Sequence, residues 1–510
     1  MWRCKTSFSV YSFPMLSADC SDPLPPSPEP VPVDMAQILA LLGVDRYSKE
    51  DVQAVEQGLA DVLLDLPNQE VLHRDCARAT CLTGRALTEE GNVKVLALER
   101  VLTYYCREHG CEYRQGLHDL AAPLVLCLDT LPQAYLALRE LLRRLMPSVP
   151  MGRELVVYQQ LCEVTGVLVT FLDPELASVI EGAGLSPDMY ALDWFTTLYG
   201  SMFKCGDHTF GGVQGPGGRA ASSACLYVWL SWLRDHAGAA PLCVVFFGLA
   251  WLLQHSDDIK LCGPVPELPE YLKRTVCSMD PTAVDLDFLL RKMGELLTST
   301  PRSYLRHVQR VLACLSSEGG GVCLTVEADD AVAFSEGLST QQLCVLVDIR
   351  PIHISRAAPV KGSIRFDLAV VQPEDVGVFI ERARVTQERQ GGGVVILVLN
   401  EEGELRPLVQ QFLRSLISGG VRGVTWLKGG YAALQGLAQG EDAPSLLDKL
   451  RQFEQWAGQT LTDTMVATAP LVAQPVYEET PVKVFERAPH PPLDGEALLW
   501  DSPPPRHVSR

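Results

Sequence analysis

Residues 72–78 read LHRDCAR, and residues 113–120 read YRQGLHDL. The first stretch ends in a fixed positive charge, Arg78, and the second offers one neutral amide, Gln115. The segment between them has a helical pattern, which would hold the two groups at a set distance. GTP hydrolysis uses such a pair, because an arginine neutralises charge on the transferred phosphoryl group and a glutamine orients the water. The pattern therefore indicates phosphoryl transfer, where an arginine supplied in trans contributes about 10³ to 10⁵ in rate.

The spacing of these residues resembles the two finger motifs of the TBC domain, the helical module that activates Rab GTPases. That family has I-x-x-D-x-x-R followed by Y-x-Q-G, and Leu72 stands here in place of the isoleucine. The resemblance implies that Arg78 is an arginine finger and that Asp75 is its orienting carboxylate. It also implies that Gln115 replaces the glutamine of the GTPase.

Tyr113 and Gly116 complete the second motif, and the resemblance implies that they belong to the surface that binds a GTP-bound Rab. His118 departs from the family pattern, which has asparagine at this position, and could impair docking. A structural alternative remains for Arg78. The pattern L-x-x-D-x-x-R occurs by chance on many helices, and Arg78 would then form only a surface salt bridge with Asp75.

Composition excludes several classes of protein. With 510 residues, of which 47% are hydrophobic, the chain can bury large cores and suggests roughly two to four domains. A net charge of −19 argues against sequence-independent nucleic-acid binding, which needs clustered lysine and arginine. The apolar run 241–253 is shorter than the ~20 residues that cross a bilayer, so we expect a buried core helix and no transmembrane segment.

The sixteen cysteines are scattered through apolar segments, which favours a reduced interior over a disulfide framework. Cys106 and Cys111, with His109 between them and His118 nearby, form the one cluster to test as a metal site. Their spacing does not match a zinc motif, and no second pair follows. We therefore expect no metal site and no cofactor.

Apolar residues recur at steps of three and four from residue 35, which is typical of amphipathic helices. Almost nothing between residues 35 and 312 has the pattern of a strand. We expect an all-α TBC domain over residues 35–315, preceded by a disordered leader over 1–34 that is rich in proline and serine. Helices are predicted over 93–105, 120–128, 134–145, 155–170 and 189–203.

Four further segments resemble the member 23 type of the TBC family, and they read LDLPNQ (64–69), DPEL (173–176), PDMYALDW (187–194) and STPRSYL (299–305). In that type a rhodanese-like domain follows the TBC domain. The type has degenerate fingers and is regarded as a binding module, whereas this chain has both Arg78 and Gln115.

Continuous apolar runs follow residue 312 and predict an α/β domain with a parallel sheet. The runs are LCVLVDIRP (343–351), VVILVL (394–399) and VTWL (424–427), with helical patterns between them. The run VLVDIR and the later LKGGYAAL (427–434) resemble the rhodanese fold, which places a rhodanese-like domain over 316–440.

A rhodanese sulfurtransferase needs a cysteine at the head of the loop that follows the second of these strands. The loop here reads LNEEGELR (399–406), and no cysteine occurs after Cys344. Its carboxylates would also repel a thiolate. We therefore interpret it as an inactive rhodanese loop, with no sulfur-transfer activity, that comprises Asn400, Glu401, Glu402, Gly403 and Arg406.

The C-terminal part predicts one more amphipathic helix over 441–460, which would pack on the second domain, and a disordered proline-rich tail over 461–510. Asp494, Leu498 and Leu499 resemble an acidic dileucine sorting motif, a pattern that also arises by chance.

Two hypotheses of function remain open. The first is a trafficking protein of the endosome-to-Golgi route that tethers vesicles through its TBC and rhodanese-like surface and also activates a Rab GTPase with Arg78 and Gln115. The second follows from the member 23 resemblance: a non-catalytic tether that binds golgin tails on the trans-Golgi and holds endosome-derived vesicles. Both imply a cytoplasmic protein that associates with trans-Golgi and endosomal membranes through its partners.

Overall fold

The structure is a computed structural model, and it describes residues 35–79, 89–149, 154–203, 217–262, 266–281, 283–315, 321–330, 343–358, 360, 363–389 and 394–437. Several predictions lie outside these residues: the leader 1–34, the helix 441–460, and the tail 461–510 with Asp494, Leu498 and Leu499.

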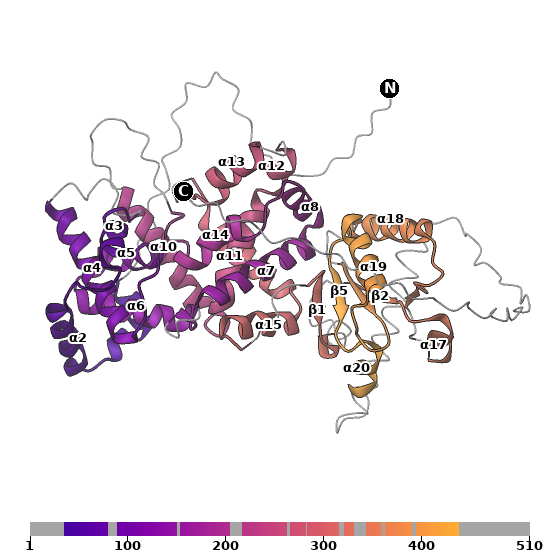
Figure 1. Ribbon diagram of the computed structural model, residues 1–510, viewed down its shortest axis with the longest axis horizontal. Helices are drawn as coiled ribbons and strands as arrows, with labels where there is room; N and C mark the ends of the chain where they lie inside the picture. The colour runs from indigo at the N-terminus through magenta and orange to yellow at the C-terminus, as the bar shows by residue number, and fades with distance from the viewer. Residues whose placement is uncertain are drawn as a thin grey trace, which may run out of the picture. The chain divides into compact units, whose positions relative to one another are not determined.

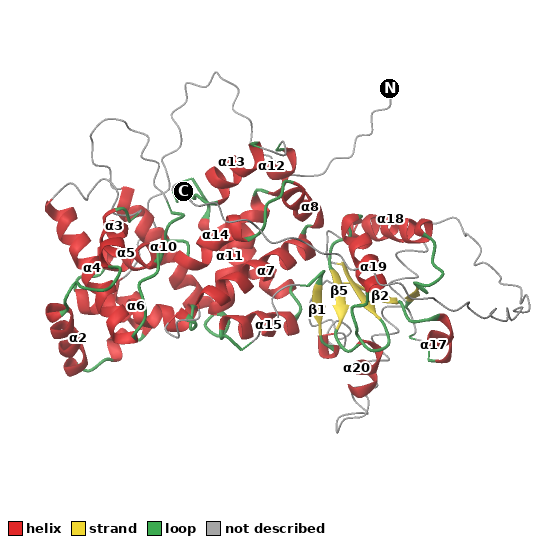
Figure 2. Cartoon of the chain, viewed as in Figure 1, coloured by secondary structure: helices red, strands yellow, loops and turns green. Residues whose placement is uncertain are grey.

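Helices make up the first part of the chain (Figures 1 and 2). The first group comprises α1 (Met35–Leu42), η1 (Val44–Arg46), α2 (Lys49–Asp61), α3 (Gln69–Ala77), α4 (Glu89–His109), α5 (Leu117–Cys127), α6 (Leu131–Leu145), α7 (Glu154–Leu172), α8 (Pro174–Gly182) and α9 (Asp188–Thr197). The second group comprises α10 (Gly217–Asp235), α11 (Ala240–Gln254), α12 (Ser256–Leu261), α13 (Glu267–Tyr271), η3 (Leu272–Val276), α14 (Leu286–Ser299) and α15 (Arg302–Leu312).

Polar side chains fix where several of these helices begin. Ser48 and Asp51 form a reciprocal capping box at the start of α2. Asp173 accepts a hydrogen bond from the backbone N–H of Leu176 at the start of α8, and Asp285 accepts one from Phe288 at the start of α14. Such caps satisfy N–H groups that have no partner within the helix.

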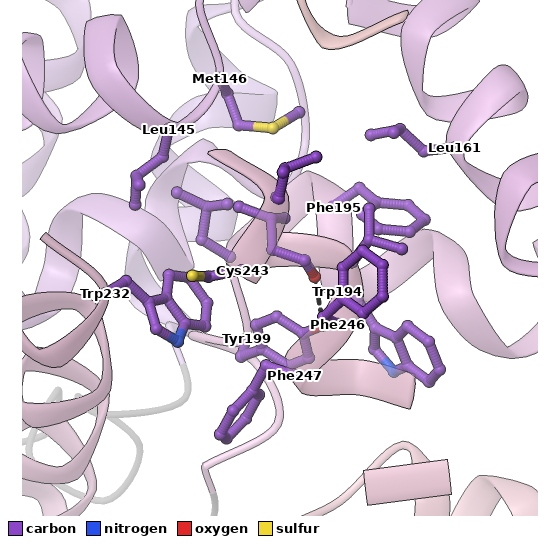
Figure 3. Packing of buried hydrophobic residues seen from close by; sticks show 14 of the residues in the cluster. Leu145, Met146, Leu161, Trp194, Phe195, Tyr199, Trp232, Cys243, Phe246 and Phe247 are labelled. Atoms are coloured by element: carbon purple, nitrogen blue, oxygen red, sulfur yellow. Dashed lines mark hydrogen bonds between the residues drawn. The ribbon is translucent and has the colours of Figure 1, made fainter. Parts of the chain in front are cut away.

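The core of the helical part surrounds α11, the apolar run that was predicted to be a buried helix. Nearly every side chain of α11 is buried, which confirms that prediction. Figure 3 shows aromatic side chains packed around it. The Tyr199 and Phe247 rings lie 5.0 Å apart edge to face, and the Trp232 and Phe247 rings lie 5.7 Å apart. Such aromatic pairs add to the stabilisation that apolar burial gives.

The helix predicted over 189–203 is wrong at its C-terminal end. Helix α9 stops at Thr197, because Leu198 and Tyr199 have positive φ angles of 45° and 69°. Two buried hydrogen bonds hold this turn: Trp229 Nε1 donates to the Leu198 carbonyl, and the Tyr199 hydroxyl donates to the Val244 carbonyl. These tertiary contacts override the local helical pattern.

Helix α7 is the one described helix that is long and apolar enough to cross a membrane, over Leu155–Leu172. Of this window, 61% is buried inside the fold, and a core helix passes the same test of length and composition.

The second part of the chain contains a five-stranded parallel sheet of order β1-β5-β4-β2-β3, which confirms the predicted parallel α/β architecture. Figure 2 shows its strands in yellow with helices beside them. The elements are β1 (Leu324–Val326), β2 (Leu343–Asp348), α17 (Ile352–Ala357), β3 (Ile364–Arg365), α18 (Pro373–Arg389), β4 (Val394–Leu399), α19 (Pro407–Ser418), β5 (Val424–Leu427) and α20 (Gly430–Leu437).

Both faces of the sheet are buried, which explains the continuous apolar runs. On β2, Cys344 and Leu346 join one buried cluster, while Val345 and Val347 join another. The three predicted strands are confirmed as β2, β4 and β5. Strands β1 and β3 were not predicted, because runs of three and two residues are too short to show a period.

The cysteines of the described residues form no disulfide with one another. Cys106 hydrogen-bonds to Cys111, and burial together with this bond raises the pKa of the Cys106 thiol. His109 turns its Nδ1 to the Tyr105 carbonyl, 3.0 Å away. Within the described ranges, no group of three or more His, Cys, Asp or Glu side chains could hold a metal ion.

Candidate functional site

Asp75 and Arg78 form an ion pair at the C-terminal end of α3. Arg78 Nη2 lies 2.6 Å from Asp75 Oδ1, three residues earlier on the same helix turn. The Asp75 side chain is 2% exposed, whereas the Arg78 side chain is 59% exposed. A buried carboxylate therefore holds one edge of a guanidinium that otherwise faces solvent. Arginine suits this role because its planar fork offers several donors at once.

Tyr113 connects this pair to the second motif. Its buried hydroxyl donates a hydrogen bond to Asp75 Oδ2 at 2.9 Å. Its backbone carbonyl accepts one from Asn68 Nδ2, just before α3, also at 2.9 Å. Burial and the Asp75 charge raise the pKa of Tyr113 well above its ordinary value, so the hydroxyl stays protonated as a donor. Tyr113 thus anchors the segment that carries Gln115 to α3.

Gln115 and Gly116 form the turn that opens α5. Gln115 is exposed, and its side chain makes no hydrogen bond to the part of the chain that the structure describes. Gly116 has φ 108°, which L side chains rarely adopt. An added Cβ would also lie 2.8 Å from the Thr196 carbonyl oxygen near the end of α9. The turn is therefore pressed against α9 and presents the Gln115 amide to solvent.

Gly116→Ala is expected to destabilise the helical part by about 2–3 kcal/mol, because a strained φ and a steric clash act together. Gly110→Ala is the matched control: Gly110 also has a positive φ, 60°, but a Cβ there would meet nothing within 4 Å. It should cost only about 1 kcal/mol. Denaturant unfolding of both variants measures the difference. Equal losses would contradict the close approach of Gly116 to Thr196.

His118 completes the buried part of the site. Its Nδ1 lies 2.9 Å from the Tyr113 hydroxyl and accepts from the Gly116 N–H at 3.3 Å. Its Nε2 lies 3.4 Å from Asp119 Oδ2. Burial lowers the pKa of His118; Asp119 and Asp75 oppose this effect, and Arg78 reinforces it. The ring is therefore neutral at neutral pH.

Buried Asp75 contacts both the exposed Arg78 of its own motif and the buried Tyr113 hydroxyl of the other motif. Gln115 and Gly116 connect to these residues through Tyr113 and His118. The sequence marks His118 as a departure from the family pattern and as a neighbour of the Cys106–Cys111 cluster, but it does not point to Asn68 or Thr196. Their contacts join residues far apart in the chain, which no local spacing reveals.

A shallow depression of about 410 Å³ lies on the exposed face of α3, and Gln69, Glu70, His73 and Arg74 line it. His73 Nδ1 lies 2.8 Å from Glu99 Oε2 on α4, and Gln69 Nε2 donates to Glu99 Oε1 at 2.7 Å. These contacts fix α3, which ends just before Arg78, against α4.

Comparison with known proteins identifies the family of the domain that carries both motifs. Residues 44–207 match the Rab-GTPase-TBC domain family, a range that contains both motifs. Residues 44–207 therefore form a domain of the TBC class. This confirms the TBC resemblance read from residues 72–78 and 113–116.

Individual relatives are distant. The chain is 24% identical over 285 residues to a human TBC domain-containing protein kinase-like protein, covering 55% of this chain and 28% of the relative. The mouse protein of the same name is 23% identical over 274 residues, covering 53% and 27%. This chain thus spans little more than a quarter of these relatives. The crystal structure of the Ypt/Rab-GAP domain of Gyp1p is similar at 14% identity and a TM-score of 0.38, covering 51% of this chain and 85% of that one.

In the α/β part, hydrogen bonds and an ion pair within the loop between β4 and α19 fix the conformation of that loop. Asn400, its first residue, accepts from the Gly403 N–H through Oδ1 at 2.5 Å and donates to the Glu404 carbonyl at 2.9 Å. Gly403 has φ 72° and lies so close to Gly429 that a Cβ would clash with its backbone. Arg406 pairs with Glu404 at 2.9 Å. The polar groups of the loop therefore satisfy one another.

Arg350 lies beneath this loop with a fully buried side chain. It donates from Nε and Nη2 to the two oxygens of buried Asp348, at 2.9 and 2.8 Å. Its Nη1 lies 3.4 Å from Glu401, and its guanidinium lies 3.9 Å from the centre of the Tyr431 ring. One arginine thus joins β2, the loop and α20.

Arg350→Lys is expected to lower the free energy of unfolding by roughly 2 kcal/mol, because an ammonium cannot reproduce the two-pronged bond to Asp348. Arg406→Lys is the control, since that side chain is 68% exposed and its exposed pairs contribute about 0–1 kcal/mol. Denaturant unfolding checks both variants. An equal, small effect would show that the Asp348–Arg350 pair does not hold this part together.

Proposed function

We propose that this chain activates a Rab GTPase, with Arg78 as the arginine finger, Asp75 as its orienting carboxylate and Gln115 as the amide that orients the attacking water. The observation that carries the proposal is the pairing of buried Asp75 with the largely exposed guanidinium of Arg78 at 2.6 Å. Asp75 also accepts from Tyr113, two residues before Gln115. One buried carboxylate therefore supports both proposed fingers.

In this mechanism the Rab supplies GTP and Mg²⁺, and the chain supplies two groups in trans. Arg78 enters the nucleotide site and neutralises charge that develops on the transferred phosphoryl group. Gln115 orients the water for in-line attack. Asp75 limits the conformations of Arg78, so less entropy is lost when the finger enters the site. Tyr113 and Gly116 hold the Gln115 turn at the Rab-binding surface.

Single-turnover GTP hydrolysis across a panel of Rab proteins tests the proposal. At least one Rab should be accelerated about a hundredfold or more, which corresponds to ~2.7 kcal/mol of barrier. A panel in which no Rab responds would reject the activator hypothesis.

For the α/β part we propose a rhodanese-like scaffold without sulfur transfer. Asn400 stands at the head of the loop, where a sulfurtransferase would need its cysteine. Asn400, Gly403 and Arg406 are engaged within the loop or its neighbours, and Glu401 and Glu402 bring negative charge. A loop with these carboxylates is better suited to binding a partner than to stabilising a thiolate.

The alternative function is a non-catalytic tether that binds golgin tails in endosome-to-Golgi transport, with the chain located on trans-Golgi and endosomal vesicles. It is supported by the member 23 resemblance of segments such as 64–69 and 299–305. The tether predicts that alanine at Arg78 and Gln115 leaves capture of golgin tails unchanged. Pull-down of golgin tails with the double variant separates the two functions.

A further inference from the structure

His118 contacts the Tyr113 hydroxyl, which binds Asp75, and also the Gly116 N–H beside Gln115. It is the second residue of α5, and its ring is 5% exposed. Its Nδ1 lies 2.9 Å from the hydroxyl that binds Asp75 and 3.3 Å from the Gly116 N–H of the Gln115 turn. On the other side of the ring, Nε2 faces Asp119 at 3.4 Å. No other described side chain contacts both the Tyr113 hydroxyl and the Gly116 N–H.

The hydrogen atoms available to these contacts are limited. Tyr113 has one hydroxyl proton, and both Asp75 Oδ2 and His118 Nδ1 lie 2.9 Å from its oxygen. When Nδ1 carries no proton, it accepts from Gly116 and shares the Tyr113 proton with Asp75. When Nδ1 is protonated, it donates to the Tyr113 oxygen, and the Gly116 N–H loses its acceptor. The proton on Nδ1 therefore decides whether the ring supports the turn.

We propose that His118, in its neutral form, is a positioning residue that fixes the Gln115 turn relative to the Asp75–Arg78 pair. The proposal rests on the Rab-activating function proposed above. His118 does not touch the nucleotide; it acts through Gly116 on one finger and through Tyr113 and Asp75 on the other. Protonation of the ring releases Gly116 and loosens Gln115, so it should lower kcat more than it changes KM.

The charged and titratable groups that face His118 are Asp119 on α5, Asp75 and Arg78 on α3, and the Tyr113 hydroxyl. Burial dominates and lowers the pKa of His118 below 6.5, while the two carboxylates limit the shift. Since the unfolded chain binds this proton more readily, folding stability should fall as the pH drops below about 6.5. The loss should level off below the folded-state pKa.

The activity test compares wild type, His118→Asn and His118→Leu in single-turnover hydrolysis between pH 5 and 8. Asparagine places Oδ1 as many bonds from Cα as Nδ1, so it can still accept from Gly116, but it does not titrate. Wild-type kcat should fall by about tenfold one pH unit below the pKa of His118, and this fall should be absent in His118→Asn. His118→Leu should be slower at every pH with little change in KM.

His236→Asn is the matched control, because His236 lies beyond the end of α10 and contacts neither motif. The dependence of kcat on pH in His236→Asn should follow that of the wild type. Intrinsic hydrolysis by the Rab is subtracted at each pH. The proposal is overturned if His118→Asn keeps the wild-type fall in kcat, or if His118→Leu matches wild-type kcat.

An NMR titration of the His118 ring in the chain alone tests the same contacts without a Rab. Asp75→Asn should lower the pKa of His118 below that of the wild type, because the Asp75 charge raises it. An unchanged titration would overturn the coupling of His118 to Asp75 whatever the activity. A wild-type chain that accelerates no Rab would instead reject the proposed function, and with it the catalytic use of His118, even where the titration shifts as expected.

Discussion

Arg78→Ala should return GTP hydrolysis nearly to the intrinsic rate of the Rab; on a Rab that the wild-type chain accelerates roughly 10³-fold, this is a loss of about 4 kcal/mol of transition-state stabilisation. The guanidinium of Arg78 is largely exposed, and Asp75 fixes one edge of it. An alanine leaves developing charge on the phosphoryl group without this neutralisation. Single-turnover hydrolysis at saturating chain concentration measures the effect on chemistry separately from docking.

Two further variants make this result specific. Arg74→Ala removes an exposed arginine one turn earlier on α3, whose Nε bonds to the Glu70 carbonyl at 3.3 Å. It should change the rate only a few-fold, because a rim charge acts mainly on association. Arg78→Lys should not restore the rate, since lysine lacks the planar fork. If Arg74→Ala and Arg78→Ala lose the same activity, Arg78 contributes only general charge.

Gln115→Ala should reduce the accelerated rate about a hundredfold, or ~2.7 kcal/mol, with little change in affinity for the GTP-bound Rab. We expect this loss because the exposed Gln115 amide lies on a turn whose position Gly116 and Tyr113 fix. The effect should be sharpest on a Rab whose own catalytic glutamine has been replaced. The wild-type chain should still accelerate that Rab, and Gln115→Ala should not.

Glu112→Ala is the control for this experiment, because Glu112 is an exposed side chain in the same connection between α4 and α5. It should behave as wild type. Should the wild-type chain accelerate a normal Rab but not the glutamine-replaced one, the water would be oriented by the Rab, and Gln115 would serve only in docking.

Much of the fold and of the candidate site can be predicted from local sequence. The spacing of Asp75, Arg78 and Gln115 predicted the TBC domain, and apolar period predicted the main helices and the three longer strands. Such signals are local, since they depend on the repeat of a helix or a strand. The confirmed elements are accordingly the long ones, such as α11 and β4.

The remainder depends on contacts that local patterns do not record. The bond from Tyr113 to Asp75 joins residues 38 positions apart, and it exists only because α3 and α5 pack together. The early end of α9 at Thr197 follows from contacts of Leu198 and Tyr199 with α10 and α11. His118 shows the same limit: its departure from the family pattern was visible in the sequence, whereas its place between both motifs was not.

The central claim is that Arg78 and Gln115 stabilise the transition state of a Rab in trans. Its most direct test is binding of the chain to a GDP-loaded Rab with and without aluminium fluoride, which mimics the transferred phosphoryl group. Binding should tighten at least ~10²-fold when aluminium fluoride is present, because an activator is complementary to the transition state. The gain should vanish in both Arg78→Ala and Gln115→Ala. Equal binding with and without aluminium fluoride, across Rab proteins that the chain engages, would contradict the claim and leave the tether as the better account.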